Sequence, residues 1–324
     1  MKPEKLKPGN KILVIAPSYS LSIVSRSVRL IANDSLASLG LSVSYGENAE
    51  QSNEYKSSPV TTRISDIHRA FADKEIKGIL TAIGGFNANQ LLKHLDWSLL
   101  KNNPKIFCGY SDISVLLNAI YKKTGLITYL GPHYSTFGQL KELSYTLDYF
   151  KKCLFSDLSF PIIASQSWTD DEWWLNQEDR HPINNEGWLI VNRGQARGTA
   201  IGGNISSLLL IAGTDYMPDI RGSILFLEEE GIYNINEFDR ELESFIQLPN
   251  FSGVRGLVIG RFQQKSSLTE KEIIALIKSK SELDKMPVVI QADFGHTNPM
   301  FTIPIGGLVE LTANRTATLT IITH

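Results

Sequence analysis

The sequence is poor in cysteine and in net charge. Its two cysteines, Cys108 and Cys153, are too few for a framework of disulfide bonds, and Cys108 lies in the apolar run KIFCG, where a small buried thiol is ordinary. The formal charge is -2 at pH 7, with acidic and basic residues spread along the 324 residues. Such a chain has no long-range field that would gather nucleic acid or an anionic membrane surface. We therefore expect neither nucleic acid nor a membrane as a partner.

Long apolar runs are also missing. The N-terminal stretch MKPEKLKPGNKILVIAPS has basic residues, but its apolar run of about six residues is shorter than the roughly 7 to 15 in a signal-peptide core. No later segment approaches the roughly 18 uninterrupted apolar residues of a membrane span. These absences predict a cytoplasmic protein. With 42% hydrophobic residues and more than the length of an average domain, the chain is expected to form two domains.

Up to about residue 160, short apolar runs alternate with amphipathic helical stretches, as in IKGILTAIGG followed by ANQLLKHLDWSLL. This alternation is typical of β-α-β units on a parallel sheet, in which ligands bind at the carboxyl ends of the strands. From about 190 to 324, strand-like and helical stretches mix, and TANRTA predicts a hairpin between the last two strands. The sequence therefore predicts an α/β fold with a parallel-sheet domain over 1–160 and an α+β domain over 190–324.

The segment 161–189 breaks the pattern. It contains SQSWTDDEWWLNQEDRHPINNEGW, which is polar and aromatic and holds four of the five tryptophans. A long stretch without a clear period inside a compact protein is usually a functional loop or a linker. We interpret it as both a linker and an aromatic substrate loop.

Ser111 lies between a buried strand and the first turn of a helix, in KIFCGYSDIS. A serine on such a sharp turn has the geometry of a nucleophile elbow, and the next backbone N–H supplies one donor to an oxyanion. The alternative is that Ser111 or Asp112 only caps the helix, since both residue types are preferred caps. The sequence alone leaves both interpretations open.

A second strand end is rich in glycine. In TAIGGFNANQLL, the backbone at Gly84 and Gly85 can approach a ligand closely, and its N–H groups are candidates to complete an oxyanion hole with that of Asp112. A phosphate cradle is a rival, but neither the dinucleotide fingerprint nor a P-loop is present. A plain turn is the third interpretation.

A serine nucleophile needs a base, and the base needs an orienting acid. His296 follows the apolar strand VVIQADFG, and His133 lies at another strand end. ILFLEEEG ends a strand with acidic residues, of which Glu228 is nearest the apolar core. The alternatives are a locally bonded histidine and a solvated acidic turn. No His or Cys cluster has metal-ligand spacing, so we expect no metal.

Five motifs together resemble those of the LD-carboxypeptidase family of serine peptidases: GYSD, IGGFNANQLL, GGNISSL, GTDYMPDIRGSILFLEE and GHTNP. The family has two branches, the muramoyl-tetrapeptide LD-carboxypeptidases and the microcin C immunity hydrolases. The resemblance implies an N-terminal Rossmann-like domain similar to class I glutamine amidotransferases and a smaller, β-rich C-terminal domain. It also implies a homodimer without a metal or cofactor.

Carried over by motif, the resemblance makes Ser111 the nucleophile, Glu228 the orienting acid and His296 the base. The backbone N–H groups of Gly85 and Asp112 are then the oxyanion donors. The glycine that α/β-hydrolases have two residues after the nucleophile is absent here, but this departure leaves the match to the family's Gly-x-Ser-Asp elbow intact.

The loop sequence WTDDEWWLNQEDR looks like the aromatic loop of the immunity branch, where a tryptophan stacks on the nucleobase of an aminoacyl-sulfamoyl adenylate. Trp173 and Trp174 are the two candidates, and the alternative is that both bury against the second domain. A carboxypeptidase must also hold a free carboxylate, for which Arg180, Arg193 and Arg197 are candidates.

Two classes of function therefore stand at this point. The first is a serine hydrolase acting on a small peptide or an aminoacyl-nucleotide, through an amide or an acyl-sulfamate bond. The second is a non-catalytic protein that binds a small molecule, in which Ser111 and the Gly84-Gly85 turn would only hold an anion.

Overall fold

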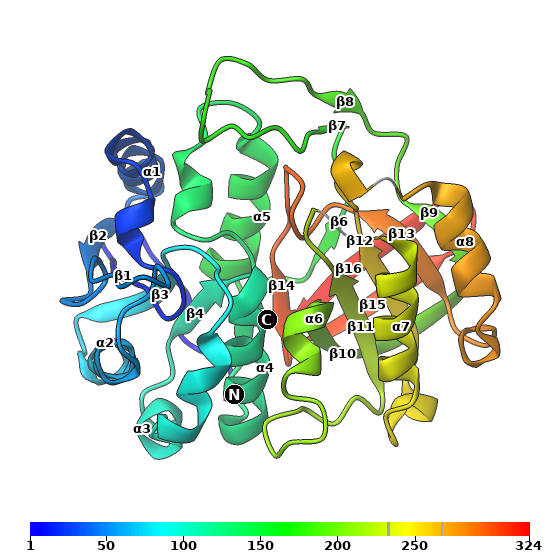
Figure 1. The fold of residues 1–324 in the computed structure, drawn as a ribbon, viewed down its shortest axis with the longest axis horizontal. Coiled ribbons are helices and arrows are strands. Elements are labelled where there is room, and N and C mark those ends of the chain that lie inside the picture. The colour runs from blue at the N-terminus through cyan, green and yellow to red at the C-terminus, as the bar shows by residue number, and fades with distance from the viewer. Residues whose placement is uncertain (232–233, 267) are drawn as a thin grey trace.

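Two large β-sheets, each covered by helices, lie beside each other in the computed structural model, which describes residues 1–231, 234–266 and 268–324 (Figure 1). Within these described residues, no helix has both the length and the apolar character needed to cross a membrane. The predicted α/β class, with a parallel-rich first sheet and a β-rich second part, is confirmed.

The first sheet has six strands in the order β14-β5-β4-β3-β1-β2. Its five N-terminal strands pair in parallel, and the last strand, β14, pairs antiparallel with β5. Helices follow these strands as the alternating pattern predicts. The elements are β1 (Lys11–Ile15), α1 (Arg26–Ser38), β2 (Ser42–Tyr45), α2 (Val60–Ala72), β3 (Ile76–Thr81), α3 (Trp97–Asn102), β4 (Ile106–Gly109), α4 (Ser114–Thr124), β5 (Thr128–Leu130), α5 (Ser144–Phe155) and β14 (Ile303–Ile305).

One predicted helix is divided. The stretch ANQLLKHLDWSLL forms a 3-10 helix over Ala88–His94, and α3 begins only after Asp96. The Asp96 carboxylate accepts a hydrogen bond from the Leu99 N–H at 2.9 Å, which caps α3 and starts it as a separate helix.

The second sheet has eight strands in the order β6-β16-β15-β10-β11-β12-β13-β9. Its central strands β10 to β13 are parallel, and the remaining pairings are antiparallel. The predicted hairpin at TANRTA is confirmed, because β15 and β16 pair on either side of it. The elements are β6 (Phe160–Ile162), β9 (Leu189–Asn192), β10 (Gly194–Asn204), α6 (Ile205–Leu209), β11 (Ser223–Glu228), α7 (Ile235–Ile246), β12 (Gly256–Gly260), α8 (Glu270–Lys278), β13 (Val288–Ala292), β15 (Leu308–Ala313) and β16 (Ala317–Thr323).

Each sheet includes one strand from the other half of the chain. β6, from the end of the N-terminal segment, completes the second sheet, while β14, from the C-terminal segment, covers the edge strand β5 of the first. An added strand removes an exposed edge that would otherwise present unpaired backbone groups. The division of the chain at residues 160 and 190 stays a prediction.

The sheets meet where α4 packs on the end of β10. Ser114 Oγ accepts a hydrogen bond from the Asn204 N–H at 3.0 Å, and the Asn118 side chain donates to the Gly202 carbonyl at 2.8 Å. Gly203 has φ +141°, and a Cβ at this position would overlap the Ser114 hydroxyl. This seam lies one helical turn after the Ser111 elbow and at the end of the strand that pairs with β11.

Candidate active site

Ser111 occupies a strained turn between β4 and α4. Its φ is +60°, in the left-handed region that residues other than glycine and asparagine seldom adopt. No side chain caps α4, so neither Ser111 nor Asp112 has the capping role that the sequence left open. Within the described part of the chain, the Ser111 hydroxyl makes no hydrogen bond. The residue is therefore held in place by its backbone while its side chain stays free to react.

The glycine turn that follows β3 lies directly against this serine. A Cβ built on Gly84 would lie 3.0 Å from Ser111 Oγ, and Gly85 has φ +152°, a conformation that a residue with a Cβ rarely adopts. The backbone N–H groups of Gly85 and Asp112 have no hydrogen-bond partner among the residues that the structure describes. The turn thus places two unused donors beside Ser111.

Glu228 and His296 form a direct pair on the second sheet. Glu228 ends β11 and is 1% exposed, and its Oε2 lies 2.7 Å from His296 Nδ1. Burial of the imidazole disfavours its charged form, but the Glu228 carboxylate, with smaller contributions from the charges of Glu230 and Glu229, outweighs this and raises the pKa of His296 to about 9. The alternative of a solvated acidic turn holds only for Glu230, which is exposed. Glu229 is buried and accepts a hydrogen bond from the Asn204 amide at 2.8 Å.

The structure also brings His133 close to Ser111, because both side chains lie near Gly84. The ring of His133 stacks on Tyr110 with centroids 4.1 Å apart, and the same tyrosine contacts His296 with centroids 5.3 Å apart. His133 Nδ1 lies 2.8 Å from Thr81 Oγ1, while Nε2 has no partner among the described residues. Burial, with the nearby His296, holds the pKa of His133 well below its usual value, so this ring is neutral. In the sequence, only the place of His133 at a strand end indicated that it lies near the site.

The tryptophan loop begins beside the turn that carries His296. Thr169 and Asn298 exchange backbone hydrogen bonds of 2.7 and 2.8 Å, which pins the start of the loop two residues after His296. In Figure 1 the loop between β7 (Ser167–Trp168) and β8 (Ile183–Asn184) arches over the top of the molecule and extends above α5. Trp173 is buried and 7% exposed, whereas Trp174 is 51% exposed, with the two rings in an edge-to-face contact of 5.8 Å.

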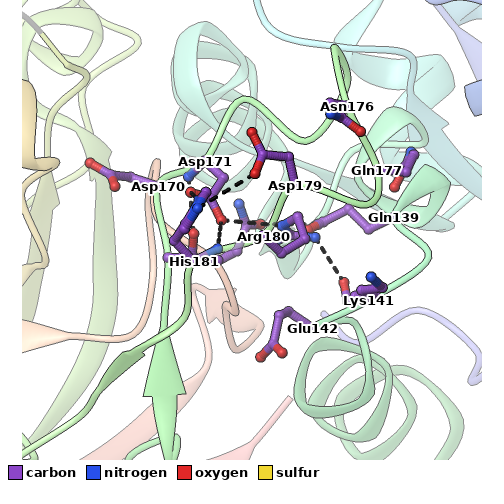
Figure 2. A network of polar contacts seen from close by, with 12 residues as sticks. Gln139, Lys141, Glu142, Asp170, Asp171, Asn176, Gln177, Asp179, Arg180 and His181 are labelled. Atoms are coloured by element: carbon purple, nitrogen blue, oxygen red, sulfur yellow. Dashed lines mark hydrogen bonds and ion pairs between the residues drawn. The ribbon is translucent and has the colours of Figure 1, made fainter.

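Polar contacts tie this loop to both halves of the molecule. Figure 2 shows Arg180, near the end of the loop, joining it to the segment before α5. Arg180 donates to the Lys141 carbonyl at 3.2 Å, to Gln139 Oε1 at 3.4 Å and, within the loop, to Asp171 Oδ2 at 3.4 Å. On the other side, Asp170 accepts from the Gln264 backbone at 2.6 Å. The loop is therefore bonded both to the N-terminal half, before α5, and to the C-terminal half, after β12.

These contacts bear on the arginines proposed for a substrate carboxylate. The Arg180 side chain is almost fully buried and is already engaged by the loop. Arg193 and Arg197 are exposed at the start of β10, and Arg197 lies roughly 23 Å along the strand from Asn204, which is beside Glu228. None of the three arginines presents a free guanidinium to the Glu228 end of the sheet.

The arrangement has the parts that nucleophilic acyl transfer requires: a half-buried serine hydroxyl without a hydrogen-bond partner among the described residues, an imidazole paired with a carboxylate, and two backbone donors. Among the residues that the structure describes, no group of three or more His, Cys, Asp or Glu side chains is placed to hold a metal ion.

Comparison with protein families agrees with this description. Residues 12–131 match the family model of the LD-carboxypeptidase N-terminal domain, and residues 197–311 match that of the LD-carboxypeptidase C-terminal domain. The chain belongs to the LD-carboxypeptidase family, and it is a hydrolase by that membership. The family resemblance drawn from the five motifs is thereby confirmed.

Individual relatives span nearly the whole chain. YocD of Bacillus subtilis is 45% identical over 313 residues, covering 97% of this chain and 96% of YocD. The crystal structure of an MccF-like protein from Bacillus anthracis is 48% identical with a TM-score of 0.99, and all of both chains is covered. The microcin C7 self-immunity protein MccF of Escherichia coli is 29% identical over 314 residues, 93% of this chain and 90% of MccF. A structure of MccF in complex with aspartyl sulfamoyl adenosine has a TM-score of 0.90, covering 100% of this chain and 98% of MccF.

Proposed function

We propose that this protein is a serine hydrolase in which Ser111 is the nucleophile, His296 the base and Glu228 the acid that orients it. The observation that carries the proposal is the 2.7 Å pair of His296 and Glu228 on one sheet, which meets the strained Ser111 elbow of the other sheet across the ring of Tyr110. A free serine hydroxyl and a carboxylate-bound imidazole on either side of one ring are the parts from which a triad is built.

In the proposed reaction, His296 Nε2 accepts the Ser111 proton as Oγ attacks the carbonyl carbon of the substrate. The carbonyl oxygen becomes an oxyanion and accepts hydrogen bonds from the N–H groups of Gly85 and Asp112. The imidazolium returns its proton to the leaving group, and Ser111 is left acylated. Water, deprotonated by His296, then cleaves the ester and releases the acid.

The choice of His296 over His133 as base rests on their partners. A base becomes charged when it takes the proton, and Glu228 stabilises that charge on His296 at 2.7 Å. His133 has only the Thr81 hydroxyl as partner and a pKa well below its usual value, so burial penalises its charged form.

We propose an aminoacyl-nucleotide as the substrate class, cleaved at an amide or acyl-sulfamate bond. Trp174 supports this class, because its indole is 51% exposed on a loop that starts beside the His296 turn, and an exposed aromatic ring is suited to stack on a base. The MccF complex with aspartyl sulfamoyl adenosine shows this ligand chemistry on the same fold. The burial of Trp173 favours a packing role for that residue.

A muramoyl tetrapeptide is the second candidate substrate, favoured by the family's carboxypeptidase description. In that case the tryptophan loop serves packing alone. We further propose a cytoplasmic homodimer, a division into domains at residues 160 and 190, and no need for a metal or cofactor.

The test incubates the purified protein, and Ser111→Ala beside it, with a mixture of a muropeptide tetrapeptide and aspartyl-sulfamoyl adenosine, and follows all masses. We expect release of aspartate, and a loss of turnover of about a thousandfold or more in Ser111→Ala with the fold intact. Loss of the terminal D-alanine instead would support the peptidase alternative. Full activity in Ser111→Ala would refute the triad, and no reaction of either substrate would favour the binding-protein alternative.

A further inference from the structure

The glycine turn beside the nucleophile is held by a buried cluster of side chains. The Ser18 hydroxyl, three residues after the end of β1, donates to Asp112 Oδ2 at 2.5 Å and accepts from the Phe86 N–H at 3.0 Å. The same carboxylate oxygen accepts from the Ala88 N–H at 2.9 Å. Ser18 is 0% exposed and Asp112 is 2% exposed, so water does not compete for these bonds.

These contacts join the two proposed oxyanion donors to each other. One donor is the backbone N–H of Asp112. The other is at Gly85, in a turn that is bonded to the Asp112 carboxylate through the Ser18 hydroxyl and the Ala88 N–H. A Cβ at Gly85 would overlap the Ser18 hydroxyl, which places that hydroxyl directly behind the donor. One residue thus contributes one donor by its backbone and fixes the other by its carboxylate.

A third residue supports the far side of the turn. The buried Arg63 guanidinium, from α2, donates to the Pro17 carbonyl at 3.1 Å, to Asn87 Oδ1 at 2.9 Å and to Gln90 Oε1 at 2.9 Å. It therefore links the segment after β1, which contains Ser18, to the residues that follow Gly85. The donors are held by a network that connects α2, the segment after β1 and the turn before α4.

We propose that the Ser18 hydroxyl and the Asp112 carboxylate are positioning residues that set the geometry of the oxyanion donors at Gly85 and Asp112. This inference rests on the proposed function. Neither side chain touches substrate, so the affinity for the ground state should not depend on them. Oxyanion donors act only when charge develops on the carbonyl oxygen, and a displacement of about 1 Å is enough to weaken them strongly.

The test compares Ser18→Ala with Ser20→Ala. Ser20 is an equally buried serine two residues further on, whose hydroxyl bonds to Ser22 and to the Ala49 carbonyl, away from the glycine turn. We expect Ser18→Ala to lower kcat on aspartyl-sulfamoyl adenosine about 10- to 100-fold with KM within twofold of the original. Ser20→Ala should keep kcat within about twofold. Asp112→Asn, which retains the shape of the side chain, should lower kcat further than Ser18→Ala.

A second measurement separates this inference from the proposed function. A fluorophosphonate probe phosphonylates an activated serine as fluoride leaves, and its tetrahedral oxygen needs the same donors whatever the natural substrate. Failure of the wild-type protein to label at Ser111 would remove the proposed function. Labelling of wild type and Ser18→Ala at equal rates would overturn the positioning role alone. Equal losses in Ser18→Ala and Ser20→Ala, or a rise in KM in place of the fall in kcat, would also overturn it.

Discussion

The two sheets contribute to the site in different ways. On the first sheet, Ser111 is fixed by a strained backbone, and the glycine turn beside it is held by hydrogen bonds to the buried Asp112 carboxylate and from the Arg63 guanidinium. On the second sheet, His296 is controlled by charge, because Glu228 raises its pKa to about 9. The first sheet thus fixes geometry and the second fixes protonation. Changes in the first should lower the rate equally across pH, and changes in the second should move the pH profile.

The largest effect that sharpens this comparison is expected from Glu228→Gln. We expect kcat to fall about 10⁴-fold, as when the orienting acid of a triad is neutralised. The pKa of His296 should also fall from about 9 toward its usual range, because burial remains while the carboxylate charge is lost. The base works only when unprotonated, so kcat/KM rises with pH through this pKa, and its acid limb should move to lower pH.

Glu230→Gln is the matched control, because Glu230 is exposed and acts on His296 only through its charge at longer range. It should move the acid limb slightly and leave kcat nearly unchanged. The profile of kcat/KM between about pH 5 and pH 10 measures both variants. An acid limb that stays in place in Glu228→Gln would contradict the control of protonation by this pair.

The next effect in size is expected at the seam between the sheets. In Gly203→Ala the new Cβ would overlap the Ser114 hydroxyl, and φ +141° would strain the backbone at a cost of about 1 to 3 kcal/mol in unfolding free energy. We expect kcat to fall about hundredfold, because a shift of about 1 Å between Ser111 and His296 is enough for such a loss.

Gly213→Ala is the control for backbone strain without displacement. Gly213 has φ +74°, but a Cβ there would meet nothing within 4 Å. Thermal unfolding should show a loss of stability in both variants, whereas only Gly203→Ala should lose activity. Equal activity of the two variants would mean that this seam does not set the relative position of the two sheets.

The sequence predicted the parts of the molecule that depend on local pattern. The elbow at Ser111 and the acidic end of β11 follow from the alternation of apolar and polar residues. By contrast, β14 has only the residues IPI, and its pairing with β5 depends on contacts far apart in the chain. The same holds for the bond between Ser18 and Asp112, which are 94 residues apart. Such contacts have no local signature.

The local sequence pattern also did not predict which single side chains are buried. Trp173 and Trp174 are neighbours with the same chemistry, and only the packing of the loop on the rest of the chain distinguishes the buried ring from the exposed one. His133 was set apart only by its place at a strand end. Its neutral state follows from burial and from the nearby His296, which no periodicity reveals.

The smallest effect is expected from substitutions in the tryptophan loop, which is bonded to both halves of the molecule. Stacking of an aromatic ring on a base contributes about 1 to 3 kcal/mol, so Trp174→Ala should raise KM for aspartyl-sulfamoyl adenosine about tenfold at unchanged kcat. Trp174→Phe retains a ring and should recover most of the loss, and activity on a muropeptide should be the same in all three proteins. Trp173→Ala, in contrast, removes a buried ring and should lower the melting temperature. An unchanged KM in Trp174→Ala would remove the stacking role and leave the loop as a packing element, so that discrimination between substrates would have to come from the walls of the site itself.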